Sequence, residues 1–142
     1  MIKYPAKIVR EEDGKYSVFF LGDGMGGCMT FGMSLDDAKK NAQEALDLYI
    51  EYLYSEKRRI PIPSDIVGND IYYFEPNFRI QFALKLRDSR EKIRLSQSEM
   101  AARMGILPAQ YQRLENPKKT NPTLETINRI EEALHSKVFL KQ

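Results

Sequence analysis

The sequence predicts an α+β protein built from two small domains, a strand-rich domain followed by an all-helical one. Its 142 residues are enough for one or two cores. Thirteen of the fifteen Phe and Tyr residues precede residue 83. Residues 1–77 hold nine Lys and Arg against thirteen Asp and Glu, whereas residues 78–120 hold ten against four. This division of charge indicates two domains with different partners, and we expect them at residues 1–76 and 77–142.

Four short runs rich in β-branched and aromatic residues predict the strands of the first domain. Ile2–Arg10 and Lys15–Leu21 flank an Asp-Gly pair at 13–14 that suits a hairpin turn. Cys28–Phe31 and Ile71–Phe74 are the third and fourth expected strands. The first three expected strands therefore follow one another closely in the sequence, and about forty residues separate them from the fourth.

A helix fills that gap, because apolar residues recur there at helical spacing. It is expected over about 35–56, beginning after Ser34, whose hydroxyl is a suitable N-cap. The alternating prolines of 60–63 require extended backbone after it. Asn77 is the expected cap of a second helix that runs to about Ile93. Shorter helical pieces follow to the C-terminus, so the second domain is predicted to be all-α.

The composition argues against a membrane protein and against a disulfide-stabilised secreted one. No apolar run approaches the roughly 18–20 residues needed to cross a bilayer, and the first residues lack the apolar core of a secretory signal. Cys28 is the only cysteine, so neither an internal disulfide nor a multi-cysteine zinc site can form. We expect a cytoplasmic protein with no membrane partner, no cofactor and no metal.

Residues that suggest catalysis have a simpler structural explanation. Gly22–Gly27 matches G-x-G-x-x-G after a predicted strand, but a strand rather than a helix follows it, so no helix N-terminus is available to hold a pyrophosphate. The glycines are expected to allow a long connection between two strands. The only histidine, His135, lies near the end of a short helix, and Cys28 has no evident base partner. We expect no catalytic residue.

The stretch from residue 95 to 117, LSQSEMAARMGILPAQYQRLENP, carries the clearest functional signal. Ser96 is a suitable cap for a short helix, Gly105 supplies a tight turn, and Pro108 suits the first position of a second short helix. Two short helices this close in sequence form a helix-turn-helix. A plain helical hairpin is the alternative, but the excess of six positive charges over residues 78–120, ten minus four, favours nucleic-acid binding.

Residues 82–134 resemble the helix-turn-helix domain of the Xre/Cro and lambdoid phage repressor class, whose pattern is L-T-Q-x-E-L-A-x-x-x-G-[IV]-S-x-x-x-I-S-x-[LI]-E-N-G. Tyr111 occupies the apolar position of the recognition helix. The chain departs from the pattern at Leu107, where a polar N-cap is frequent, and at Pro117, where glycine is usual. The matching positions are Leu95, Gln97, Glu99, Ala101, Gly105, Ile106, Leu114, Glu115 and Asn116.

The resemblance implies a role for each residue of this site. Gln97 would contact DNA phosphate and brace the recognition helix, and Arg90 would pair with Glu115 as a structural ion pair. Arg113 would read guanine and Gln112 adenine, each such contact contributing about 1–3 kcal/mol against a wrong base. The residues expected to face the major groove are Pro108, Ala109, Gln110, Gln112 and Arg113. The residues expected at the DNA backbone are Asn116, Lys118 and Lys119.

The first domain resembles the HicB antitoxin domain, whose pattern is roughly Y-x-V-x-F-P-D-x-P-G-C-x-T-x-G-x-[ST]-x-x-E-A-x-x-N-A-x-E-A-L followed by I-P-x-P-S. Leu21 and Gly26 replace prolines of this pattern, and the loop carries an insertion. Together the two resemblances cover nearly the whole chain, in the order of HicB antitoxins with an appended helix-turn-helix. The matching positions are Tyr16, Val18, Phe20, Asp23, Gly27, Cys28, Thr30, Gly32, Ser34, Ala38, Asn41, Ala42, Glu44, Ala45, Leu46, Ile60, Pro61, Pro63 and Ser64.

This second resemblance implies both a fold and a function. The fold is a partial RNase H-like β-β-β-α-β domain without the carboxylate set of the nuclease. Residues 1–76 would bind and neutralise a HicA-like toxin, a small basic protein that cleaves RNA, and the acidic first domain suits such a partner. Residues 77–142 would dimerise and bind operator DNA to repress the operon. Because helix-turn-helix proteins usually bind two half-sites, we expect a homodimer or a higher homo-oligomer.

The C-terminal tail is a candidate for the dimer contact. Lys137–Leu140 is predicted to be a short edge-like strand that pairs across a dimer. The alternative is a frayed end.

Two other functions are consistent with the sequence. The chain is either a stand-alone repressor whose first domain senses a small ligand, or an RNase H-like nuclease. The nuclease needs carboxylates gathered around Mg²⁺. The available acidic residues lie on a loop and on the solvent side of a predicted helix, where plain solvation is the simpler interpretation. They are Asp23, Asp36, Asp37, Glu44 and Asp47.

Overall fold

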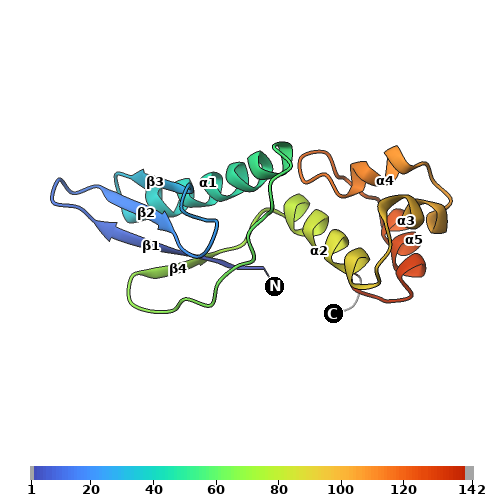
Figure 1. The fold of residues 1–142 in the computed structure, drawn as a ribbon. Coiled ribbons are helices and arrows are strands. Elements are labelled where there is room, and N and C mark those ends of the chain that lie inside the picture. Colours follow the sequence, from blue (N-terminus) through green and yellow to red (C-terminus); the bar gives the residue numbers. More distant parts are fainter. Residues whose placement is uncertain (1, 140–142) are drawn as a thin grey trace. The chain divides into compact units, whose positions relative to one another are not determined.

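The computed structural model describes residues 2–139 and shows two compact units (Figure 1). The N-terminal unit is Met1–Asn77 and the C-terminal unit is Phe78–Gln142. The chain therefore passes from one unit to the other between Asn77 and Phe78. Among the described residues, no helix combines the length and the apolar character that crossing a membrane requires.

The N-terminal unit is one antiparallel sheet covered by one helix. Its elements follow the chain as β1 (Tyr4–Arg10), β2 (Tyr16–Phe20), β3 (Met29–Gly32), α1 (Leu35–Ser55) and β4 (Ile71–Phe74). The strands lie in the order β3-β2-β1-β4, and each neighbouring pair is antiparallel. The predicted β-β-β-α-β order is therefore confirmed, with element ends that differ from the expectation by a few residues.

Side chains alternate across this sheet, and α1 packs against only one of its faces. Ala6 pairs with Phe20 and Ile8 with Val18 across β1 and β2, and all four are buried. The helix turns five residues toward them, at the spacing expected of an amphipathic helix. These buried residues of α1 are Ala38, Ala42, Leu46, Ile50 and Leu53. The core of the unit lies between this face of the sheet and α1.

α1 begins as the sequence predicts and approaches β3 very closely. The Ser34 hydroxyl accepts a hydrogen bond from the backbone N–H of Asp37 at 3.1 Å, which satisfies one of the free donors of the first turn. At Gly32 the strand touches the helix backbone, because a Cβ there would overlap the backbone of Asp37 and Ala38. Glycine is therefore required at this contact between β3 and α1.

The glycine-rich loop after β2 packs against the proline-rich segment that precedes β4. Gly22 and Gly24 have φ angles of +107° and +84°, which favour glycine. A Cβ at Gly24 would lie 2.8 Å from the ring of Pro61, and the Tyr49 hydroxyl donates to the Gly24 carbonyl at 2.6 Å. The hydroxyl of Tyr4 donates to the Pro61 carbonyl at 2.6 Å. This geometry supports the structural interpretation of the glycine pattern.

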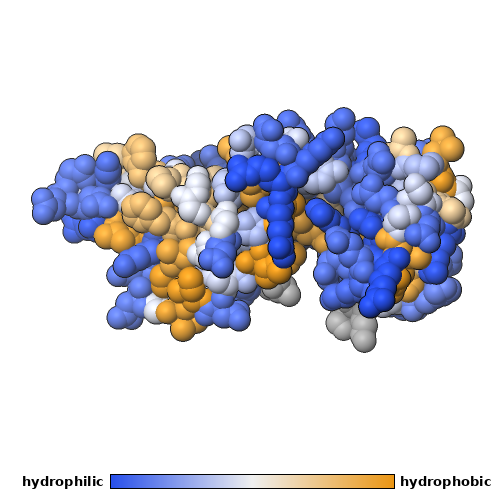
Figure 2. Space-filling model, in the orientation of Figure 1, coloured by the Kyte–Doolittle hydropathy of each residue, from blue (hydrophilic) through white to orange (hydrophobic). Residues whose placement is uncertain are grey.

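The segment between α1 and β4 leaves apolar side chains on the surface. Ile62, Ile66 and Val67 are exposed, and Figure 2 shows hydrophobic surface around β4 and the segment that leads into it. The hydroxyl of Tyr73 donates to the backbone carbonyl of Ile66 and ties the segment to β4.

Residues 78–139 of the C-terminal unit contain four helices, in agreement with the all-α domain that the sequence predicts. They are α2 (Phe78–Lys92), α3 (Gln97–Met104), α4 (Pro108–Leu114) and α5 (Leu124–Leu134). Their buried side chains form one core, to which every helix contributes. The members of this core are Leu86, Met100, Ala101, Met104, Tyr111, Ile130, Ala133 and Leu134.

The end of the chain differs from the predicted edge-like strand at Lys137–Leu140. Residues 137–139 are not a strand, and Leu140 lies outside the described residues. The ring of Phe139 lies 4.9 Å from that of Phe82, and the backbone N–H of Phe139 donates to the buried carboxylate of Glu131 at 2.9 Å. The strand prediction was wrong because these contacts fold the tail back onto its own core.

We predict that Gly32→Ala lowers the free energy of unfolding of the N-terminal unit by about 1–3 kcal/mol, since the added methyl group must displace α1. Urea denaturation followed by tyrosine fluorescence measures this, because seven of the eight tyrosines lie in residues 1–77. Gly26→Ala is the matched control, since no atom lies within 4 Å of a Cβ at that position. Equal destabilisation by the two changes would contradict the close approach.

Candidate nucleic-acid interface

α3 and α4 form a helix-turn-helix whose boundaries are set by local hydrogen bonds. The Ser96 hydroxyl accepts from the backbone N–H of Glu99 at 3.0 Å, and the Glu99 carboxylate accepts from that of Ser96 at 2.9 Å, a complete capping box. Gly105 ends α3 with a left-handed φ of 70°. Pro108 occupies the first turn of α4. The two helices are therefore joined by a short, well-defined turn.

α4 presents one face to solvent and packs Tyr111 and Leu114 against the core. Tyr111 is completely buried. Around it the helix exposes the five side chains that the sequence assigned to the major groove. These exposed residues are Pro108, Ala109, Gln110, Gln112 and Arg113.

A buried ion pair connects α2 to the end of α4. Arg90 Nε donates to Glu115 Oε2 at 2.6 Å and Arg90 Nη2 donates to Oε1 at 3.0 Å, a bidentate arrangement. The side chains of Arg90 and Glu115 are only 11% and 2% exposed. Arg90 Nη1 also donates to the Leu95 carbonyl at 2.8 Å, and Gln97 Nε2 donates to Glu115 Oε1 at 3.2 Å. The pair thus joins α2, α3 and α4.

This pair also sets the electrostatics around the recognition helix. The hydrogen bond with Glu115 raises the pKa of Arg90, which therefore stays charged. Burial raises the pKa of the Tyr111 phenol, and the neighbouring Glu115 carboxylate raises it further, so this side chain stays neutral at every ordinary pH. The pair implied by the resemblance is present in the structure as a close, largely buried contact.

Two of the residues assigned to DNA also hold the site together. Gln110 Oε1 accepts from the backbone N–H of Leu107 at 2.9 Å, which caps α4 in place of the missing polar residue at position 107. Asn116 Oδ1 accepts from the backbone N–H of Lys118 at 3.0 Å and organises the turn after α4. Sequence reasoning missed both roles. A glutamine three residues after the cap position was the available signal for the first.

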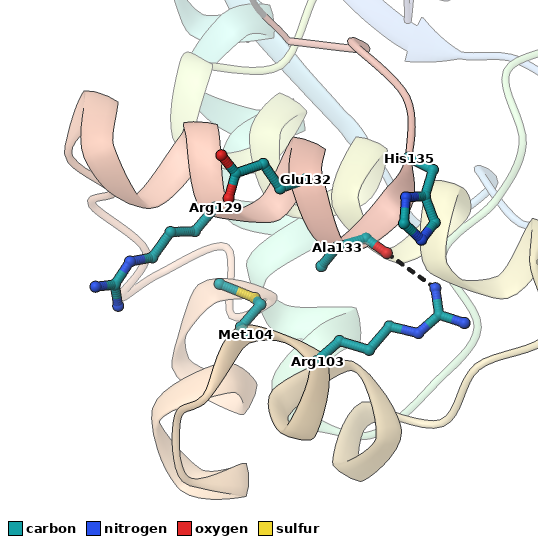
Figure 3. Close-up of a pocket in the computed structure, with 6 residues that line it drawn as sticks. All are labelled: Arg103, Met104, Arg129, Glu132, Ala133 and His135. Carbon is teal, nitrogen blue, oxygen red and sulfur yellow. Dashed lines mark hydrogen bonds between the residues drawn. The ribbon is translucent and has the colours of Figure 1, made fainter.

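The remaining phosphate candidates lie beyond α4. Lys118 and Lys119 are exposed in the turn that follows the helix. Arg113 is exposed as well, so three exposed cations lie between residues 113 and 119. Arg103, by contrast, donates to the Ala133 carbonyl at 2.9 Å and is bound to α5 (Figure 3).

The residues that suggested catalysis lie in unsuitable surroundings. Cys28 is buried, and burial raises the pKa of its thiol to about 12, so almost no thiolate forms near neutral pH. His135 caps the end of α5 in a left-handed conformation. It lines a cavity of about 490 Å³, and none of the six side chains lining that cavity is a Ser, Thr or Cys (Figure 3).

The acidic residues considered for Mg²⁺ do not converge. Among residues 2–139, no group of three or more His, Cys, Asp and Glu side chains is arranged to hold a metal ion. Asp47 is occupied by the chain itself, since its carboxylate accepts from the backbone N–H of Asn77 at 3.0 Å. Burial raises the pKa of this carboxyl group, although hydrogen bonds from Asn77 and Gln43 act in the opposite direction.

Comparison with known proteins bears directly on both units. The family model described as the HicB-like antitoxin of bacterial toxin-antitoxin systems matches residues 4–82, which is more than half of the chain. The chain belongs to this family of antitoxins. A helix-turn-helix family model matches residues 86–138. Both resemblances and the predicted fold class are therefore confirmed.

One curated protein and one solved structure are similar to the chain. Antitoxin HicB 1 of Photorhabdus laumondii subsp. laumondii is 23% identical over 139 residues, which cover 98% of this chain and 86% of the relative. The crystal structure of the N-terminal domain of Burkholderia pseudomallei antitoxin HicB is 17% identical, with a TM-score of 0.46. The match covers 54% of this chain and 100% of the solved chain.

We predict that Arg90→Ala destabilises the C-terminal unit by about 3–5 kcal/mol, because it leaves the Glu115 carboxylate buried and unpaired. Hydrogen exchange of the α3 and α4 amides measures this loss in the full chain. Arg87→Ala is the matched control. Its ion pair with Glu91 is exposed, so the expected change is within about 0.5 kcal/mol. Similar exchange rates in both variants would show that the buried pair is not essential to this fold.

Proposed function

We propose that this chain is a non-enzymatic antitoxin that binds and neutralises an RNA-cleaving toxin of the HicA type, and that it represses its own operon by binding operator DNA. The family membership of residues 4–82 carries the first part. The outward-facing α4 within a helix-turn-helix carries the second. Both partners belong to the cytoplasm, and we place the protein there.

The exposed face of α4 suits the major groove of DNA. Arg113 can donate two hydrogen bonds to guanine, and Gln112 has the amide needed to read adenine. Gln110 keeps its amide N–H donors, because only its Oε1 is used in capping Leu107. Lys118 and Lys119 supply charge for the phosphate backbone, which adds affinity that falls with salt. Pro108 and Ala109 offer only apolar contact.

Gln97 has a more specific role than phosphate contact alone. Its Nε2 atom donates to Glu115 Oε1, so the side chain is already oriented by the buried pair. We assign Gln97 to bracing α4 and to meeting a phosphate from that fixed position. A homodimer or higher homo-oligomer would place two copies of α4 about 34–36 Å apart, one turn of DNA.

Co-expression tests the antitoxin role directly. We expect a small neighbouring gene to arrest growth when expressed alone, and the full chain to restore growth, because the complex removes the ribonuclease from RNA. Growth and the integrity of total mRNA are the two measurements. Arrest that the chain does not relieve would refute the antitoxin role. It would leave a repressor with a ligand-sensing first domain as the remaining interpretation.

For DNA, we predict that Arg113→Ala abolishes specific binding to the promoter of the chain's own gene and leaves toxin neutralisation intact. Fluorescence anisotropy with promoter and scrambled duplexes measures specificity. Lys118→Ala is the contrasting variant. It is expected to weaken binding to both duplexes alike, and to lower the slope of log affinity against log salt concentration by about one. If Arg113→Ala binds its promoter within about twofold of the original chain, α4 does not read bases as proposed.

A further inference from the structure

α1 carries most of the acidic excess of the N-terminal unit. The helix Leu35–Ser55 holds five Asp and Glu residues against two lysines. One of those lysines, Lys39, has its ammonium group 4.8 Å from the centre of the Tyr72 ring. Five minus two is a net charge of −3, compared with −4 (nine minus thirteen) for residues 1–77 as a whole. The negative charge of the unit is therefore concentrated along one helix.

The solvent side of α1 also exposes large apolar side chains. Leu48 is 66% exposed and Tyr52 is 50% exposed. Counting from Glu44, the residues Leu48, Glu51 and Tyr52 follow at spacings of four, seven and eight, so all four lie along one side of the helix. We call these four residues the outer stripe of α1. Two large apolar side chains exposed one turn apart, Leu48 and Tyr52, favour a protein-binding surface, and the flanking carboxylates give it a negative charge.

The acidic groups of the outer stripe are free to meet a partner. Within residues 2–139, the ion pairs engage neither Glu44 nor Glu51. The opposite side of α1 is fixed, because Ala42, Leu46 and Ile50 are completely buried against the sheet. The outer stripe is thus a rigid surface whose charges have no competing contacts in the described chain.

The open face of the sheet is a further exposed apolar surface of this unit, besides the segment of residues 62–67, and its charge has the opposite sign to that of the outer stripe. Phe19, Met29 and Phe31 are 41%, 58% and 53% exposed there. The charged side chains of this face are lysines. Lys7 pairs with Phe19 across the strands, and the Lys15 ammonium lies 5.3 Å from the centre of the Phe31 ring. Lys15 also pairs with Asp13 at 3.9 Å, so this face offers a cationic partner less attraction than the outer stripe does.

We propose that the outer stripe of α1 is the surface on which the toxin docks, and that it binds the cationic surface with which the toxin holds RNA. This rests on the proposed antitoxin function. A protein that cleaves mRNA must offer positive charge to the phosphate backbone. Glu44 and Glu51 take the place of phosphates on that surface, while Leu48 and Tyr52 supply the desolvated contact. The toxin then cannot hold RNA and this chain together.

Two charge-reversal double variants test the location. Glu44→Lys with Glu51→Lys is expected to weaken toxin binding by about tenfold or more and to lose growth rescue, because both charges would now repel. Glu12→Lys with Asp65→Lys is the matched control, since it changes the net charge by the same amount at exposed positions of the same unit. It is expected to rescue growth and to bind within about threefold of the original chain.

A second pair of variants tests the apolar part of the surface. Leu48→Ser should weaken binding by about tenfold, whereas Met29→Ser, at a similarly exposed position on the open sheet face, should not. Circular dichroism of each purified full chain verifies folding. Rescue by the original chain together with rescue by both α1 variants would overturn the docking proposal and leave the antitoxin function standing. Loss of binding in the Met29 variant alone would place the toxin on the sheet.

Competition with RNA tests the mechanism. A fluorescent 2′-O-methyl oligonucleotide resists cleavage and reports the RNA-binding surface of the purified toxin. The full chain should displace it completely, and the Glu44→Lys, Glu51→Lys variant should displace it only at roughly tenfold higher concentration. A ternary complex of oligonucleotide, toxin and antitoxin would show that the chain binds elsewhere on the toxin. Failure of the original chain to bind the toxin at all would refute the proposed function itself.

Discussion

The buried pair of Arg90 and Glu115 is the contact on which the helix-turn-helix depends. Short helices such as α3 and α4 are marginal by themselves, and their core is small. The pair fixes the C-terminal end of α4 to α2, while its neighbour Gln97 belongs to α3. Ionised side chains this deeply buried tolerate little change in geometry, since a lost partner leaves a desolvated charge. The direction of α4, and with it the exposed face, therefore depends on this pair as well as on the packing of Tyr111 in the core.

The N-terminal unit depends on steric constraints in place of charge. Gly32 lets β3 meet the backbone of α1, and Gly24 lets the loop after β2 meet Pro61. Tyr49 and Tyr4 add hydrogen bonds from their hydroxyls to these same segments. Gly24 and Pro61, far apart in the sequence, therefore meet in the structure. A motif that resembled a phosphate-binding loop is explained by the packing of one chain segment on another.

Much of this could be predicted from the sequence, and the failures have identifiable causes. Turn residues and periodicity located the elements, and the pair of Arg90 with Glu115 followed from a recognisable pattern. The tail was misjudged because Val138 and Phe139 resemble a strand locally, while the deciding contacts with Phe82 and Glu131 are not local. Gln110 was read only as a DNA contact because its capping bond is visible only once the start of α4 is known.

The contact between Asp47 and Asn77 gives α1 a second structural role, at the end of the N-terminal unit. Asp47 lies on the same helix as the outer stripe, and its carboxylate holds the backbone of the last residue before α2. Gln43, one turn earlier, donates to the carbonyl of Glu75 at 2.7 Å. The helix therefore anchors the start of the connection to the DNA-binding unit. By thermodynamic reciprocity, a ligand that binds more tightly when this anchor is formed also raises the population of the anchored state.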